Sequence, residues 1–275
     1  MTESTWKVVM DGDGVTISGD QFSLTTNGSD PRNMETVVSE LQSVTRATYG
    51  QYCGLSRAIE MVGERWGLLI IRDLLVSPKT EAELSRGLPL IPARLLSMRL
   101  RELTFSGVIT PVDGSAGADA ADAHGESGAG RRYELTEYGR ALEDTVLALG
   151  RWGAMALAAP RPEDVVTEDA VLSALKSTYH RDAAKDVTMT VELHVGGVVV
   201  HTVVDAGRLE LHRGPTSDAD LVVYAGLELK ALLNGDLTPA DALESGDVTV
   251  TGSPDLLDHF VEMFHLPQLP RPVAA

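Results

Sequence analysis

The chain has 275 residues, of which 43% are hydrophobic and 23% are charged, a composition typical of a soluble globular protein with about two domains. No apolar run reaches the ~18 residues that a membrane-spanning helix needs, and the acid-containing N-terminus does not resemble a secretory signal. The single cysteine, Cys53, excludes an internal disulfide. We therefore expect a cytoplasmic protein with no membrane insertion.

The net charge of −17 is distributed unevenly along the chain. Residues 46–151 contain 13 Lys and Arg against 14 Asp and Glu, whereas the remainder contains 10 against 26. Four of the acids in the middle segment fall in a Gly- and Ala-rich stretch, residues 113–130. A near-neutral to basic segment between acidic ones predicts that any DNA contact is local and geometrically specific.

The first 45 residues form an N-terminal extension. Short apolar runs separated by DGDG and SGD predict strands in the first 30 residues, and residues 33–41 are typical of a helix. We assign no chemistry to residues 1–45.

From Gln51 onward, apolar residues recur at three- and four-residue spacing, which predicts two helices with a break at Gly63. The segment Thr80-Glu81-Ala82-Glu83 fits a capping box that opens a short helix ending near Gly87. The next elements have the order of a winged helix-turn-helix, which we place at residues 46–157. They are a helix from Pro92 to Ser106, strands at 108–112 and 131–135 around the loop 113–130, and a helix capped by Thr136.

The helix that begins at Pro92 has two different faces. Leu96, Leu100 and Leu103 share one stripe and should pack inward. Arg94, Ser97 and Arg101 share the opposite stripe, with Met98 near them and Arg99 flanking the buried side. Arg and Ser suit contacts with the major groove of DNA. The alternative is an ordinary solvated face with scattered arginines.

Three blocks occur in order: CGLSRAIEMVGERWGLLIIRDLL, AELSRGLPLIPARLLSMRLRELTFSGVI and RRYELTEYGRAL. Together, over about residues 50–155, they resemble the HxlR family of transcription regulators. The resemblance implies a homodimer that reads a two-fold operator in double-stranded DNA. The candidate DNA-binding residues are Pro92, Ala93, Arg94, Ser97, Met98, Arg99 and Arg101, with Arg131 and Arg132 in the wing. The sequence departs from the family at Leu90, where many members have Gly, and in its long acidic wing loop.

Residues 158–168, which begin AAPRPED, are typical of a linker. Residues 169–270 follow as an α+β domain with a mostly antiparallel sheet. Gly196-Gly197 predicts a two-residue hairpin turn, which would pair Leu193 with Val200 and Glu192 with His201.

The segments VELHVGG, GRLELHRG, DADLVVYAG and LLNGDLTPADALESGDVTVTGSPDLLDHFVEMF resemble a sterol carrier protein type 2 domain. This family folds as a layered sheet with helices around an apolar tunnel, so the resemblance implies a small hydrophobic ligand. A solid core is the alternative for every side chain that could line such a cavity. These candidates are Leu193, Val200, Leu229, Leu232, Leu233, Leu256, Phe260, Met263 and Phe264.

We therefore expect an α+β chain in which a winged helix-turn-helix domain precedes a domain with the layered sheet and helices of a sterol carrier protein. The expected function is ligand-responsive transcription regulation. Two rivals remain: a redox regulator that acts through Cys53, and a lipid carrier with a degenerate helix-turn-helix. Cys53 begins an apolar helical stripe, so we expect a buried structural thiol. No catalytic constellation, cofactor motif or metal cluster is apparent, so we do not expect an enzyme.

Overall fold

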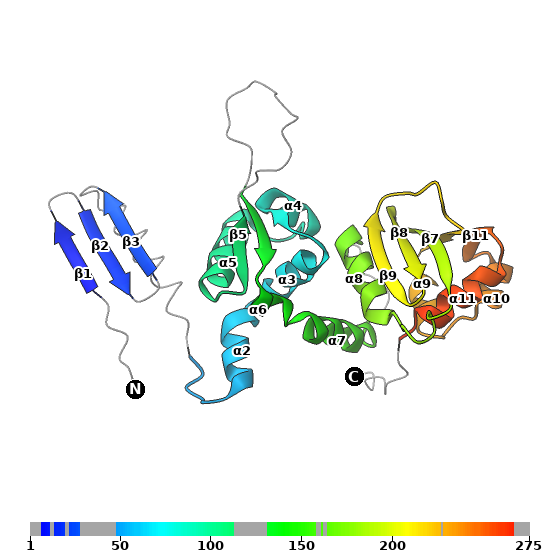
Figure 1. Cartoon of the computed structure of the whole chain (residues 1–275), viewed down its shortest axis with the longest axis horizontal. Helices are drawn as coiled ribbons and strands as arrows, with labels where there is room; N and C mark the ends of the chain where they lie inside the picture. The colour runs from blue at the N-terminus through cyan, green and yellow to red at the C-terminus, as the bar shows by residue number, and fades with distance from the viewer. Residues whose placement is uncertain are drawn as a thin grey trace, which may run out of the picture. The chain divides into compact units, whose positions relative to one another are not determined.

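The computed structural model describes residues 7–11, 14–19, 22–27, 48–112, 131–157, 161, 164–226 and 228–266 (Figure 1). The predicted helix at 33–41, the wing loop 113–130 and most of the segment 158–163 lie outside the described residues. The chain forms two compact units, Met1–Met61 and Val62–Ala275, and each is described by itself.

The first unit contains a three-stranded antiparallel sheet. Its strands β1 (Lys7–Asp11), β2 (Gly14–Gly19) and β3 (Phe22–Asn27) lie in chain order, which confirms the predicted strands. Helix α2 (Gly54–Val62) follows further along the chain. Its apolar residues Leu55 and Ile59 are exposed.

The second unit begins with the elements of a winged helix-turn-helix. A three-stranded sheet with the order β4-β6-β5 lies among the helices. The elements are α3 (Gly67–Val76), β4 (Lys79–Thr80), α4 (Glu81–Gly87), α5 (Ala93–Phe105), β5 (Ile109–Val112), β6 (Arg132–Leu135), α6 (Glu137–Arg140) and α7 (Glu143–Ala154).

Local sequence signals explain where these helices begin. Thr80 caps α4, and the predicted capping box with Glu83 is present. Thr136 caps α6 by accepting a hydrogen bond from the Gly139 amide. A Cβ atom at Gly139 would lie 2.0 Å from the Val108 carbonyl oxygen, so only glycine allows α6 to pack this closely. The core contains Ile70, Ile71, Leu74, Leu84, Leu96, Leu100, Leu103, Ile109 and Leu135.

A five-stranded sheet forms the centre of the C-terminal part of this unit. Its order is β11-β10-β7-β8-β9, with β10 parallel to β7 and every other pair antiparallel. The elements are α8 (Glu168–Thr178), β7 (Thr188–Val195), β8 (Val198–Asp205), β9 (Arg208–Arg213), β10 (Leu221–Ala225), α9 (Glu228–Leu233), α10 (Pro239–Ser245), β11 (Val248–Gly252) and α11 (Asp255–Met263).

The hairpin between β7 and β8 has the predicted register. Gly196 and Gly197 both have positive φ, 57° and 86°, as a tight hairpin turn requires. Leu193 therefore pairs with Val200, and Glu192 pairs with His201. One face of the hairpin enters the core, while Glu192 and His194 lie on the other face and hydrogen-bond to each other at 2.6 Å.

Helix α8 also packs against the winged helix, through α3 and α7. Arg151 of α7 donates a hydrogen bond to the carbonyl oxygen of Ser177 at 3.0 Å, and Lys176 of α8 pairs with Glu143 of α7. The C-terminal sheet and the winged helix thus share α8 as a common packing element.

Candidate functional site

Helix α5 presents a buried stripe and an exposed stripe, as its sequence pattern predicts. Leu96, Leu100 and Leu103 are buried, whereas Arg94 and Arg101 are exposed. Pro92, at the N-cap, and Ala93 are also exposed. The N-terminal end of α5 can therefore approach a partner closely, because small side chains and one long cation surround it.

Ser97 and Met98 are only partly exposed. The Ser97 hydroxyl hydrogen-bonds to the Glu81 carboxylate of α4 and lies 3.2 Å from the Ala93 carbonyl oxygen. A hydroxyl has one proton, so Ser97 can offer a DNA base only its acceptor lone pairs while this bond holds. The sequence did not reveal the contact between Ser97 and Glu81, because 16 positions separate them.

Arg99 does not belong to the exposed set. It is 9% exposed and its guanidinium lies among three oxygen acceptors. It pairs with Glu102 on the same helix, with Glu64 at 3.0 Å, and donates to the Arg65 carbonyl oxygen at 3.2 Å. This arrangement corrects the expectation that Arg99 contacts DNA: it fastens α5 to the segment before α3.

The two wing arginines differ. Arg131 is exposed. Arg132 donates a hydrogen bond to the Pro78 carbonyl oxygen at 2.6 Å and lies 3.5 Å from the Glu83 carboxylate. Arg132 therefore holds β6 against the start of α4, whereas Arg131 is the more exposed of the two wing arginines.

The segment before α3 contains a strained residue. Trp66 has φ 80°, in the left-handed region that side chains other than glycine rarely adopt. The Arg65 guanidinium lies 5.5 Å from the centre of the Trp66 ring, within the range of a cation–π contact. Arg65 and Trp66 are the Arg-Trp pair in the segment CGLSRAIEMVGERWGLLIIRDLL. Arg99 binds the chain at this pair, through the carbonyl oxygen of Arg65.

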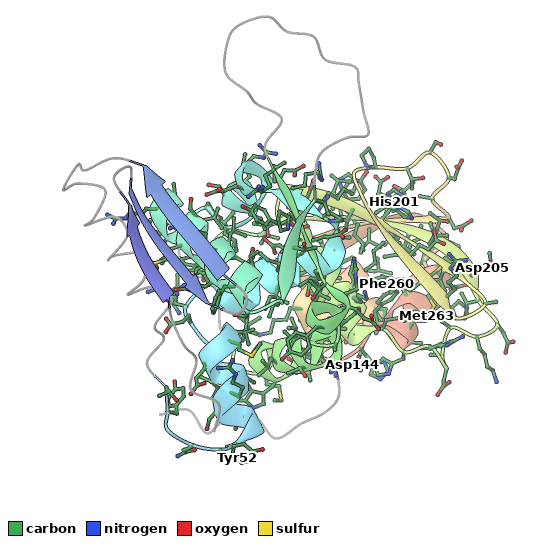
Figure 2. All side chains as sticks on the ribbon, turned by 60° about the vertical axis from the view of Figure 1, so that its left-hand side comes forward. Tyr52, Asp144, His201, Asp205, Phe260 and Met263 are labelled. Atoms are coloured by element: carbon green, nitrogen blue, oxygen red, sulfur yellow. The ribbon has the colours of Figure 1, made fainter. Side chains whose placement is uncertain are left out.

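Cys53 is exposed, which corrects the expectation of a buried thiol. It lies just before α2, where its carbonyl oxygen accepts a hydrogen bond from the Arg57 amide at 3.0 Å. Hydrogen bonds from the Ser56 and Leu55 amides lower the pKa of the Cys53 thiol. Its neighbour Tyr52 is fully exposed (Figure 2).

The structure brings the predicted ligand-lining side chains together between the sheet and the helices. Phe260 and Met263 extend from α11 into this cluster (Figure 2). Leu257 is the fully buried leucine of α11, whereas Leu256 is only partly buried at the edge. The other predicted members are all buried: Leu193, Val200, Leu229, Leu232, Leu233 and Phe264.

Two hydroxyls in this region are unusual. The Thr202 side chain, on the core face of β8, is fully buried, and its oxygen has no hydrogen-bond partner among the described residues. The Tyr179 hydroxyl is likewise buried without a partner in the part of the chain that the structure describes, and burial raises the pKa of Tyr179. Its ring lies 5.3 Å from that of Phe264. A buried hydroxyl without a partner costs free energy, so both groups could bind a polar atom of a ligand.

Within the part of the chain that the structure describes, no group of three His, Cys, Asp or Glu side chains is arranged to hold a metal ion. None of the described helices is both long and apolar enough to cross a bilayer.

The order of elements, the two-faced α5 and the β5–β6 wing define a winged helix-turn-helix protein of mixed α and β content. Residues 61–160 match the family model of the HxlR-like helix-turn-helix. The chain is 33% identical over 96 residues to the uncharacterized HTH-type transcriptional regulator YtcD of Bacillus subtilis, covering 35% of this chain and 68% of that protein. The chain belongs to the HxlR-like helix-turn-helix family.

Other relatives match this chain over a similar length. The regulator Mb3122 of Mycobacterium bovis is 38% identical over 109 residues, which is 40% of this chain and 61% of that protein. The matched segment thus spans less than two thirds of the Mycobacterium relative. A solved structure of YtcD, at 31% identity and a TM-score of 0.31, covers 37% of this chain and 94% of that one.

Proposed function

We propose that this protein is a transcription regulator that binds double-stranded DNA as a homodimer and responds to a small hydrophobic ligand in its C-terminal domain. The observation that supports DNA binding most directly is α5, where Arg94 and Arg101 are exposed above a buried leucine stripe. Two arginines on the outer face of this helix can bind guanine edges or phosphates.

Duplexes selected by the full-length protein from a randomised pool test this proposal. The R94A/R101A double variant should lose most of its affinity for the selected duplex. R208A is the matched control, because Arg208 is an exposed arginine of β9 that pairs with Glu210. If selection yields no preferred duplex, or if the double variant binds as the wild type does, α5 is not a DNA-reading helix.

The homodimer proposal rests on exposed apolar side chains of helices that flank the DNA-binding elements. Trp152 and Leu149 of α7 are 68% and 45% exposed, and Leu55 of α2 is 69% exposed. Large exposed apolar groups are typical of an interface. Sedimentation should give a dimer for the wild type and for L90S, a control in the exposed turn before α5, and a monomer for L149S/W152S.

The ligand proposal rests on the resemblance to sterol carrier protein type 2 and on the two buried hydroxyls. A mainly apolar molecule with one polar group would satisfy Thr202 or Tyr179 and otherwise contact aliphatic side chains. The fluorescent fatty acid cis-parinaric acid is a suitable probe, and native mass spectrometry would detect a co-purified ligand. T202V, which keeps the shape but removes the hydroxyl, should weaken probe binding without loss of stability. No binding by the wild type would refute this part.

A second candidate function, redox sensing, is favoured by the exposure and lowered pKa of Cys53. The chain has one cysteine, so oxidation can give a disulfide only with a second chain or with a small thiol. Diamide should then change the affinity of the wild type for the selected duplex but leave C53S unaffected. If both proteins respond alike, Cys53 is not the sensor.

A further inference from the structure

A buried ion network lies where α8 meets the winged helix. Asp169, in the first turn of α8, is 6% exposed, and Lys79 of β4 is 3% exposed. The Lys79 ammonium lies 3.1 Å from Oδ1 of Asp169. Arg213, at the end of β9, donates to the same oxygen. One carboxylate oxygen therefore joins α8, the C-terminal sheet and the winged-helix sheet.

A second carboxylate, Asp73 of α3, lies close to this network and is fully buried. Its Oδ1 accepts a hydrogen bond from Arg72 at 2.8 Å, while Oδ2 is buried with no partner among residues 48–112, 131–157, 161, 164–226 and 228–266. A Cβ atom at Gly87 would lie 2.8 Å from Oδ2 of Asp73 and 3.4 Å from Oδ2 of Asp169. Both carboxylates therefore face the end of α4, where only glycine leaves room.

The network contains charges of both signs, which come from α3, β4, α8 and β9. Arg72, Lys79 and Arg213 supply three cations, and Asp73, Asp169 and Glu168 supply three anions, with Glu168 lying 3.3 Å from Arg213. Removing one buried partner would leave another charge unpaired, which is strongly unfavourable. The elements that carry these charges are thus constrained to move together.

Lys79 is well placed to affect the DNA-binding elements. It pairs with Tyr133 of β6 in the wing sheet and immediately precedes Thr80, the N-cap of α4. The neighbouring strand residue Arg132 contacts both Pro78 and Glu83. A shift of Lys79 would therefore move the first helix of the helix-turn-helix and the base of the wing.

We propose that Asp169 is a positioning residue that transmits the state of the C-terminal domain to the helix-turn-helix. The inference rests on the proposed function only in that the transmitted change would alter DNA binding. With Asp169 between Arg213 and Lys79, β4 and the start of α4 are fixed. A rearrangement of the C-terminal core that withdraws α8 moves Asp169 away from Lys79, and β4 must adjust. One that withdraws β9 removes Arg213 from the shared carboxylate and so shifts Asp169. Such a link requires two arrangements that the C-terminal domain stabilises differently.

Hydrogen–deuterium exchange of the full chain tests the link without DNA or ligand. The perturbation is F260L, a small volume change in the C-terminal core, and the readout is amide exchange of residues 79–87. In the wild-type background, F260L should speed this exchange about tenfold. In a K79M/D169N background, which removes both buried charges together, F260L should change the exchange less than about twofold.

The E168Q background is the matched control, because Glu168 pairs with Arg213 but does not touch Lys79. There, F260L should have its full effect. Circular dichroism and sedimentation establish that each variant is folded. Equal effects of F260L in the wild-type and K79M/D169N backgrounds, or no effect in either, would overturn the proposal. Duplex selection tests DNA binding separately, so the two ideas can fail independently.

Discussion

Thr80 and Glu83 cap α4 reciprocally. The Thr80 hydroxyl accepts a hydrogen bond from the Glu83 amide at 3.2 Å, and the Glu83 carboxylate accepts one from the Thr80 amide at 2.6 Å. The same carboxylate lies 3.5 Å from Arg132. One pair of residues thus begins the first helix of the helix-turn-helix and joins it to the wing.

Loss of this cap should lower stability. T80A should reduce the free energy of unfolding by about 1 kcal/mol, whereas T249A, at an exposed position of β11, should leave it almost unchanged. Burial opposes ionisation of Glu83, but the hydrogen bonds from Thr80 prevail and lower its pKa. The stabilisation is therefore present above the pKa of an unfolded Glu and is lost as the pH falls. Urea titrations at neutral and acidic pH should show the difference between T80A and wild type shrinking in acid.

Asp73 should give the opposite pH dependence. Burial raises its pKa and Arg72 opposes this, while the charge of Asp169 raises it further. The stability that protonated Asp73 contributes to the folded state is fully present below the unfolded pKa of about 3.9. It is lost as the pH rises through the raised pKa of Asp73 in the folded state. D73N removes this loss, so its stability relative to wild type should increase between about pH 4 and neutrality. Parallel curves of stability against pH for D73N and wild type would contradict this assignment.

Two helical glycines, Gly87 and Gly150, differ in how much room surrounds the position that a Cβ atom would occupy. G87A would place a Cβ atom 2.8 Å from the Asp73 carboxylate, so it should destabilise the fold by about 1–3 kcal/mol. At Gly150 of α7 no atom lies within 4 Å of the corresponding position. G150A should therefore stabilise the protein by about 0.5–1 kcal/mol through helix propensity. Thermal unfolding should show a lower unfolding temperature for G87A and a higher one for G150A. Similar changes in both variants would show that the neighbouring atoms do not confine Gly87.

Arg94 and Arg99 should separate DNA binding from stability. R94A should weaken binding to the selected duplex by about 1–3 kcal/mol and leave thermal unfolding unchanged. R99A removes the cation that pairs with both Glu64 and Glu102 and links α5 to the segment before α3, so it should lower the unfolding temperature. Calorimetry and fluorescence anisotropy on both variants separate the two effects. If R94A is destabilised instead, its side chain has a structural role.

Local signals in the sequence predicted much of this fold. The capping box of α4 depends on residues three positions apart, and the two-glycine turn fixes the register of β7 against β8. The leucine stripe of α5 follows from helical periodicity alone.

The failures involve long-range partners. Arg99 finds Glu64 across 35 positions, and Lys79 finds Asp169 across 90. Periodicity identifies an apolar face of a helix but not which element covers that face. The prediction that Cys53 is buried was therefore wrong. The thiol lies ahead of α2, on which Leu55 and Ile59 are exposed.

The parallel pairing of β10 with β7 has a consequence for how the five-stranded C-terminal sheet folds. β7, β8 and β9 form consecutive antiparallel pairs across tight turns, so they can associate as soon as Arg213 has left the ribosome. The central strand β7 acquires its second neighbour only when the chain has continued to Ala225, and β11 joins later still. Until then one edge of β7 is unpaired and open to strand addition by another chain. The nascent sheet is therefore most prone to aggregation between these two events, and slowing synthesis after residue 213 would prolong that interval.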